Sequence, residues 1–129
     1  MLSMILDTDV VIDLQHEFPP AVAWYRTVGA GEAGIAVFVA LEVVQYARNL
    51  AESRSATKII SPMPLVWPDH RAYAWAVSEF AQLHLGYGLS MVDVLVAATA
   101  RSLDMPLCTF NVKHYRNIPD ITTIQPYQK

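Results

Sequence analysis

The sequence is poor in cysteine and lacks long apolar runs, and each shortage excludes a class of protein. Cys108 is the only cysteine in 129 residues, so no internal disulfide can form, and a reducing compartment such as the cytoplasm is expected. No apolar run approaches the roughly 20 residues that cross a bilayer. Asp7 interrupts the first apolar run too early for a signal peptide. A membrane protein or a disulfide-stabilised secreted protein is therefore not expected.

Basic residues are also scarce. Lysine and arginine number 9 against 12 acidic residues, and the formal net charge is −3. A protein that binds nucleic acid through a broad basic face needs clustered lysine and arginine to neutralise phosphates. The composition argues against that mode of binding. The composition is compatible with an enzyme in which a bound cation neutralises the phosphate.

Apolar residues, in contrast, are abundant. They make up 53% of the chain and charged residues 16%, whereas ordinary soluble domains have roughly 45–50% and 25%. Residues 1–129 are expected to form a single domain with a sizeable core. Apolar surface left over from that core would suit a partner protein or a second copy of the chain.

Short β-branched runs alternate with segments of helical periodicity along the chain. Strands are expected at 4–6, 35–38, 106–110 and 122–125, with a proline-bounded edge strand at 62–66. Helices are expected at 10–15, 21–28, 39–51 and 91–103, with another that starts after Asp69 and ends at Gly86 and Gly88. The polar stretch 53–57 is expected to be a loop or a frayed helix end. This alternation predicts a three-layer α/β/α sandwich around a parallel sheet of four to five short strands.

Four polar residues, far apart in sequence, are expected at one edge of that sheet. Asp7 ends the first strand, and Glu42 lies in the first turn of the helix after the second strand. Asp93 lies in the first turn of the helix before the 106–110 strand, which Asn111 follows. The carboxyl ends of parallel strands, and the helix starts that follow them, share one edge where ligands bind. The sequence therefore predicts a polar site there.

Most of these acids also have a structural explanation. Ser90 and Asp93 have the spacing of a helix capping box, and Glu42 is favoured early in a helix by the macrodipole. Asp9 and Asp13 are interpreted as first-turn and solvated positions. Asp7 is different, because it directly follows a buried strand, where an unpaired carboxylate is costly to desolvate.

A divalent cation would account for several carboxylates at one point. Two carboxylates 4 Å apart repel by about 4 kcal/mol at an effective dielectric constant of about 20. Hard oxygen ligands of this kind suit Mg²⁺ or Mn²⁺. As a set, the acids indicate a metal site more strongly than any one of them does alone.

Four segments of the chain are Met4-Ile-Leu-Asp-Thr-Asp-Val-Val-Ile-Asp13, Ala40-Leu-Glu42, Ser90-Met-Val-Asp-Val-Leu-Val-Ala-Ala-Thr-Ala100 and Leu107-Cys-Thr-Phe-Asn-Val-Lys-His-Tyr115. Together they resemble successive motifs of PIN-domain nucleases, with VapC-type toxins of bacterial and archaeal toxin–antitoxin pairs as the nearest group. The resemblance spans essentially the whole chain. The helix from Ser90 and the segment from Asn111 to Tyr115 are its most specific parts.

The resemblance implies a metal-dependent ribonuclease that hydrolyses RNA phosphodiester bonds. Asp7, Glu42 and Asp93 match the three acidic residues of the Mg²⁺ or Mn²⁺ site. Asn111 falls where many relatives have an acidic or amide residue. His114 falls where relatives often have a second acidic residue, which is a departure from the family pattern.

The resemblance also implies supporting residues and partners. Thr8 or Ser90 is expected to support the site through its hydroxyl group. A homodimer is implied, together with a cognate antitoxin, a segment of which occupies the active-site groove. Arg48, Arg54 and Lys58 either line that groove and contact RNA or lie on a solvated helix end and loop.

Three other interpretations match parts of the sequence. A haloacid-dehalogenase-type phosphatase would use Asp7 as nucleophile, Asp9 as acid and Thr109 in its later motif, but too little chain follows Thr109 for its remaining motifs. A receiver-type signalling domain lacks its acceptor aspartate after the middle strand. A catalytically silent PIN-fold binding module stays open, and metal-dependent RNA cleavage lost in Asp93→Asn would distinguish it from the nuclease.

Overall fold

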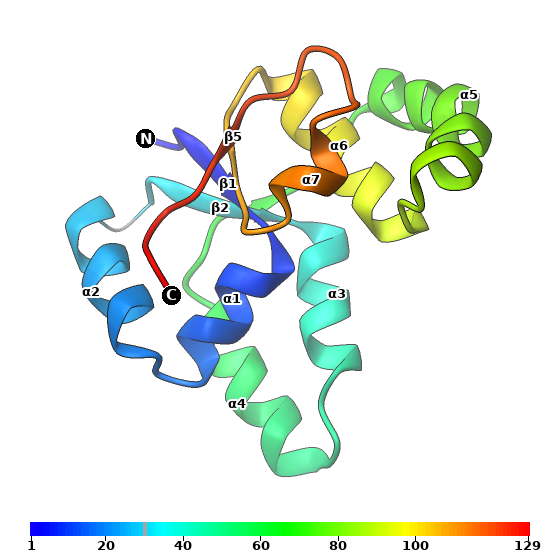
Figure 1. The fold of residues 1–129 in the computed structure, drawn as a ribbon. Coiled ribbons are helices and arrows are strands. Elements are labelled where there is room, and N and C mark those ends of the chain that lie inside the picture. The colour runs from blue at the N-terminus through cyan, green and yellow to red at the C-terminus, as the bar shows by residue number, and fades with distance from the viewer. Residues whose placement is uncertain (30) are drawn as a thin grey trace.

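The computed structural model describes residues 1–29 and 31–129 (Figure 1). At its centre is a parallel sheet of five strands in the order β3-β2-β1-β4-β5. The strands are β1 (Met4–Leu6), β2 (Ala33–Ala36), β3 (Leu65–Val66), β4 (Leu107–Cys108) and β5 (Thr123–Ile124). Helices follow the strands in alternation, and the predicted α/β sandwich is confirmed.

Helices cover both faces of the sheet. They are α1 (Thr8–Gln15), α2 (Pro19–Val28), α3 (Val37–Gln45), α4 (Leu50–Ile60), α5 (His70–Tyr87), α6 (Met91–Leu103) and α7 (Val112–Tyr115). The chain moves from β1 through β2 to β3 in one direction and then crosses back to β4 and β5. Because such crossovers are right-handed, α1–α4 lie on one face and α5–α7 on the other (Figure 1). Within the part of the chain that the structure describes, no helix combines the length and apolar character that spanning a membrane requires.

The core lies between the sheet and these helices. Ile5, Leu6, Ile35 and Leu107 on the strands are fully buried, and so is the single cysteine thiol of Cys108. α6 presents a nearly continuous buried face from Val94 to Ala100. Small side chains dominate this helix, which allows it to pack closely on the sheet and on α5.

Gly34 in β2 is packed too tightly to carry a side chain. A Cβ atom added there would lie 2.6 Å from Leu2 Cδ1 and 3.0 Å from the Pro64 carbonyl oxygen. We expect Gly34→Ala to lower the free energy of unfolding by about 1–3 kcal/mol, because β2 must shift away from β3. Gly86→Ala, in α5 with open space around its Cβ, is the matched control and should raise stability slightly. Urea denaturation measures both variants, and equal stability of the two would contradict the packing argument.

The expected helix at 39–51 is in fact two helices, and 53–57 is not a loop. α3 ends at Gln45, and Asn49 caps α4 by accepting a hydrogen bond from Glu52 N at 2.9 Å. Ser53 and Thr57 lie within α4, where their hydroxyl groups donate to backbone carbonyl oxygens of the preceding turn. The prediction was wrong because the Asn49 cap starts a helix that runs through the polar stretch.

The strand predicted at 35–38 lies at 33–36, because Val37 and Phe38 already belong to α3. The predictions for Asp69 and for the edge strand are confirmed. Asp69 caps α5 by accepting a hydrogen bond from Ala72 N at 2.9 Å. β3 is an edge strand, paired only with β2 among the described residues. Gly88, in a left-handed conformation, ends α5, whereas Gly86 lies within the helix. The short helix α7 was not predicted.

Candidate active site

An open cavity of about 410 Å³ lies where the strand order reverses, at the carboxyl ends of β1 and β4. Asp7 follows β1, and its backbone N–H donates to the Cys108 carbonyl at 2.9 Å, which holds the two strand ends together. The cavity is lined by Asp7, Thr8, Asp9, Ile12, Glu42, Tyr46, Ser90, Asp93 and Asn111. The fold thus gathers Asp7, Glu42, Asp93 and Asn111 around one space, at the edge where the sequence predicts them.

Asp7 is the most buried acid of the cavity, with 4% of its surface exposed. Its Oδ1 accepts from Thr8 N at 2.9 Å, and its Oδ2 accepts from Thr109 Oγ1 at 2.8 Å and from the Tyr115 hydroxyl at 3.1 Å. Burial, and then the charge of Asp9, raise the pKa of Asp7 from 3.8 to about 6 despite these hydrogen bonds. The folded chain therefore disfavours the charged form of a carboxylate that a cation would stabilise.

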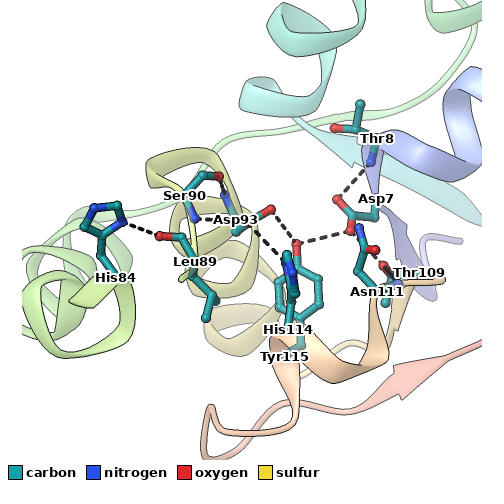
Figure 2. A network of polar contacts seen from close by, with 10 residues as sticks. All are labelled: Asp7, Thr8, His84, Leu89, Ser90, Asp93, Thr109, Asn111, His114 and Tyr115. Carbon is teal, nitrogen blue, oxygen red and sulfur yellow. Dashed lines mark hydrogen bonds and ion pairs between the residues drawn. The ribbon is translucent and has the colours of Figure 1, made fainter. Parts of the chain in front are cut away.

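Tyr115 connects Asp7 to Asp93. Its hydroxyl lies 3.1 Å from Asp7 Oδ2 and 3.4 Å from Asp93 Oδ1, and its side chain is fully buried beneath them (Figure 2). Burial, followed by the charges of Asp7 and Asp93, keeps the pKa of Tyr115 well above its ordinary value. The hydroxyl therefore stays protonated and donates to the carboxylates. Sequence reasoning did not single out Tyr115, because nothing in its local pattern shows where the ring points.

Asp93 combines a capping role with a place in the cavity. Its Oδ2 accepts from Ser90 N at 3.0 Å, and Ser90 Oγ accepts from Asp93 N at 3.1 Å, so the predicted capping box is present. His114 Nδ1 lies 3.7 Å from the same Oδ2. The other oxygen, Oδ1, is the one near Tyr115 (Figure 2). The structural and functional interpretations of this aspartate are therefore compatible.

Asp9 lies in the first turn of α1, as predicted, but it is not a solvated residue outside the site. It lines the cavity and is only partly exposed, with Oδ1 accepting from Val10 N at 2.8 Å and Oδ2 from Phe110 N at 2.9 Å. Burial raises the pKa of Asp9. Asp13 is not freely solvated either, because it accepts from the Tyr127 hydroxyl at 2.7 Å and pairs with Lys129 at 2.9 Å. These contacts dock α1 against the segments that follow β4 and β5.

The remaining polar groups of the cavity differ in how they are held. Thr8 Oγ1 is buried and has no hydrogen-bond partner among the described residues. Asn111 is exposed, and its backbone N–H donates to Thr109 Oγ1 at 3.0 Å. Glu42 is half-buried and lies in the second turn of α3, not in the first turn as predicted, because the helix already begins at Val37. In the described part of the chain, no three His, Cys, Asp or Glu side chains lie close enough together to hold an ion directly.

The three basic residues singled out in the sequence are dispersed. Arg48 pairs with Glu52 at 2.7 Å and lines a smaller cavity beside the acidic one. Arg54 is exposed on α4, and Lys58 lines a separate cavity with Leu14 and Tyr25. Only Arg48 is therefore placed next to the acidic cavity.

The PIN domain family profile matches residues 4–118, which covers nearly the whole chain. The chain belongs to the PIN domain family. The acids of the cavity thus lie in a PIN domain, and the resemblance noted in the sequence is confirmed.

Solved structures share this fold. A chain of a toxin–antitoxin complex from Klebsiella pneumoniae is similar with a TM-score of 0.76 and 22% identity, over 98% of this chain and 100% of that one. A chain of DNA-bound VapBC from Salmonella typhimurium gives 0.80 and 22%, over 96% and 98%. VapC20 from Mycobacterium tuberculosis, described as a toxin that cleaves the sarcin–ricin loop, gives 0.71 and 13%, over 88% and 94%. No curated protein matches the sequence.

Proposed function

We propose that this PIN-domain chain is a metal-dependent endoribonuclease and the toxin of a VapBC-type pair. The observation that carries the proposal is the convergence of Asp7, Glu42 and Asp93 on one open cavity at the switch point of the sheet. Structural neighbours that are toxin–antitoxin complexes, and one described as an RNA-cleaving toxin, support it. The single free thiol, Cys108, suits action in the cytoplasm.

The donors around the cavity suit Mg²⁺ or Mn²⁺. They are oxygens: four carboxylates, the unpaired hydroxyl of Thr8 and the amide oxygen of Asn111. Magnesium is usually held by one or two carboxylates and by water molecules. Direct contact with three acids at once is therefore not needed, and water can bridge the wider gaps. A cation would also offset the repulsion between Asp7 and Asp9.

Different residues of the chain would have different roles in phosphodiester hydrolysis. Asp7, Glu42 and Asp93 would hold the cation, which when bound stabilises negative charge on the phosphate and lowers the pKa of water. Asp93 would orient the attacking water or take its proton. The Asn111 amide would donate a hydrogen bond to a phosphate oxygen, and Tyr115 would keep Asp7 and Asp93 at a constant separation.

Similar solved structures and the exposed apolar surface of the chain support two proposed partners. A cognate antitoxin would bind this chain as in the complexes it resembles. We also propose a homodimer, because α5 and the start of α6 expose large apolar side chains: Val77 and Leu85 are each 82% exposed and Met91 64%. A membrane partner is not part of the proposal.

Metal-dependent cleavage of RNA tests the proposed function. Purified protein should cut single-stranded RNA with Mg²⁺ or Mn²⁺, stop when EDTA is added, and recover when the cation is restored. Isothermal titration should show Mn²⁺ binding to the protein alone. If the protein neither cuts RNA nor binds either cation, it is a catalytically silent PIN-fold binding module.

Tyr115→Phe tests the positioning of the two aspartates. The change removes the hydroxyl between Asp7 and Asp93, and we expect Mn²⁺ affinity to fall about fivefold or more, because a hydrogen bond to a charged group contributes roughly 1.5–3 kcal/mol. Tyr127→Phe, which removes a similar hydroxyl–carboxylate bond to Asp13 outside the cavity, is the matched control and should keep Mn²⁺ affinity. Equal affinities in the two variants would show that Tyr115 has only a packing role.

A further inference from the structure

A second cavity adjoins the acidic one and shares two of its walls. It has a volume of about 160 Å³ and lies between α1, the end of α3 and the start of α4. Ile12 and Tyr46 line both cavities. A strand of RNA that passes through the acidic cavity can therefore place a neighbouring nucleotide in the second one.

The chain has few cations with which to hold RNA at this place. The net charge is −3, and the nine described residues that line the acidic cavity include four carboxylates and no lysine or arginine. Arg48 lines the second cavity, but its guanidinium group is already paired with Glu52. Lysine and arginine side chains that line the two cavities can therefore neutralise few phosphates, and the proposed divalent cation would be the main positive charge there. A contact that does not depend on charge would add to the affinity for RNA.

Tyr46 is placed to make such a contact. It caps the C-terminus of α3, is 60% exposed and lies on the wall between the two cavities. Proteins that bind single strands with little sequence preference stack bases on exposed aromatic rings of this kind.

The other walls of the second cavity suit a nucleobase. Ile12 and Val43 are aliphatic and match the flat apolar faces of a base. The His16 ring and the amide oxygen of Gln15 could form hydrogen bonds with the edge of a base, while Gln15 Nε2 already donates to the Glu52 carbonyl at 3.3 Å. A phosphate in this cavity, in contrast, would be repelled by the Glu52 carboxylate.

We propose that the second cavity is a nucleobase subsite, in which Tyr46 stacks on the base of the nucleotide next to the scissile phosphate. The proposal rests on the proposed ribonuclease function and names how its substrate is held. It implies that the enzyme acts on single-stranded or unpaired RNA, because a base in a duplex cannot stack on the ring.

The test compares RNA with and without its bases. Fluorescence anisotropy would measure binding of a labelled single-stranded RNA of about 12 nucleotides, and of the same ribose-phosphate backbone without bases, to Asp93→Asn protein that does not cut. We expect Tyr46→Ala to bind the RNA at least about tenfold more weakly. Removal of the bases should lower the affinity of the protein with Tyr46 by a much larger factor than it lowers the affinity of the Tyr46→Ala protein. The Tyr46→Phe protein, which keeps the aromatic ring, should have the same affinities as the protein with Tyr46.

Controls distinguish loss of the base contact from damage to the fold and from failure of the proposed ribonuclease function. Tyr87→Ala removes another half-exposed tyrosine that lines neither cavity, and it should leave RNA affinity unchanged. Mn²⁺ binding and melting temperature should be the same for Tyr46→Ala as for the unaltered chain. One outcome is that the unaltered chain cuts RNA while removal of the bases lowers the RNA affinity of the Tyr46 and Tyr46→Ala proteins by the same factor. That result would refute the subsite and leave the proposed ribonuclease function intact. The same result is expected if the cavity receives a protein segment instead.

Salt dependence gives an independent readout. Because stacking does not release counterions, the affinity for RNA should fall with salt by a slope that corresponds to about one or two phosphate contacts. A steep slope, typical of many phosphate contacts, would overturn the proposal.

Discussion

Asp93→Asn should lower the rate of RNA cleavage by at least about 100-fold, the usual scale for loss of a positioned acid or base. Asparagine has nearly the same shape and can still accept the hydrogen bond from Ser90 N, so the capping box and α6 should survive. What the variant loses is one negative charge at the cavity, and with it attraction for the cation and the ability to take a proton. The measurement is single-turnover cleavage of labelled RNA with Mn²⁺.

Asp69→Asn provides the matched control for this substitution. Asp69 also caps a helix, α5, but it lines a different cavity with Arg71 and Arg101. The same chemical change there should leave cleavage within about twofold, since surface substitutions seldom have large effects. If Asp93→Asn cleaves RNA as fast as Asp69→Asn does, Asp93 is only a helix cap, and the proposed cation site is wrong.

Asp7→Asn should abolish cation binding yet stabilise the metal-free fold at neutral pH. The pKa of Asp7 is about 6 in the folded chain against 3.8 ordinarily, so the folded state holds this proton more tightly than the unfolded state. The contribution of Asp7 to the free energy of unfolding therefore falls as pH rises from about 4 to about 6 and stays lower above that range. A shift of about two units corresponds to roughly 3 kcal/mol. Asparagine should lack this decline.

Urea denaturation in EDTA at about pH 4 and at neutral pH measures the effect. Relative to the variant, the unaltered chain should lose stability between the two pH values, because other titratable groups contribute equally to both proteins. Added Mn²⁺ should stabilise the unaltered chain at neutral pH and leave the variant unchanged. Asp13→Asn is the control on the same helix, and it should destabilise the fold, because Asp13 is paired with Lys129 and Tyr127. An Asp7→Asn protein less stable than the unaltered chain at neutral pH in EDTA would refute this account.

Where the sequence prediction succeeded, local patterns agreed with the tertiary fold. The apolar run before Asp7, the box formed by Ser90 and Asp93, and the cap at Asp69 each specify an element within a few residues. Where it failed, two local signals conflicted. The polar stretch at 53–57 favoured a loop, while Asn49 favoured a helix start, and the packing of α4 against α1 and α3 decided for the helix.

Sequence alone determined the alternation of strands and helices, and therefore which edge of the sheet receives Asp7, Glu42, Asp93 and Asn111, because strand and helix periodicity and chain direction are local properties. Only the tertiary structure placed the Tyr115 hydroxyl between Asp7 and Asp93, drew Asp9 to Phe110 N and set Tyr46 between two cavities. The contacts of Tyr115 and Phe110 with Asp7 and Asp9 join residues more than 100 positions apart. They depend on how α7 and the end of β4 pack against α1, and so does the burial that raises the pKa of Asp7. Side-chain direction and desolvation are products of packing, and no local pattern encodes them.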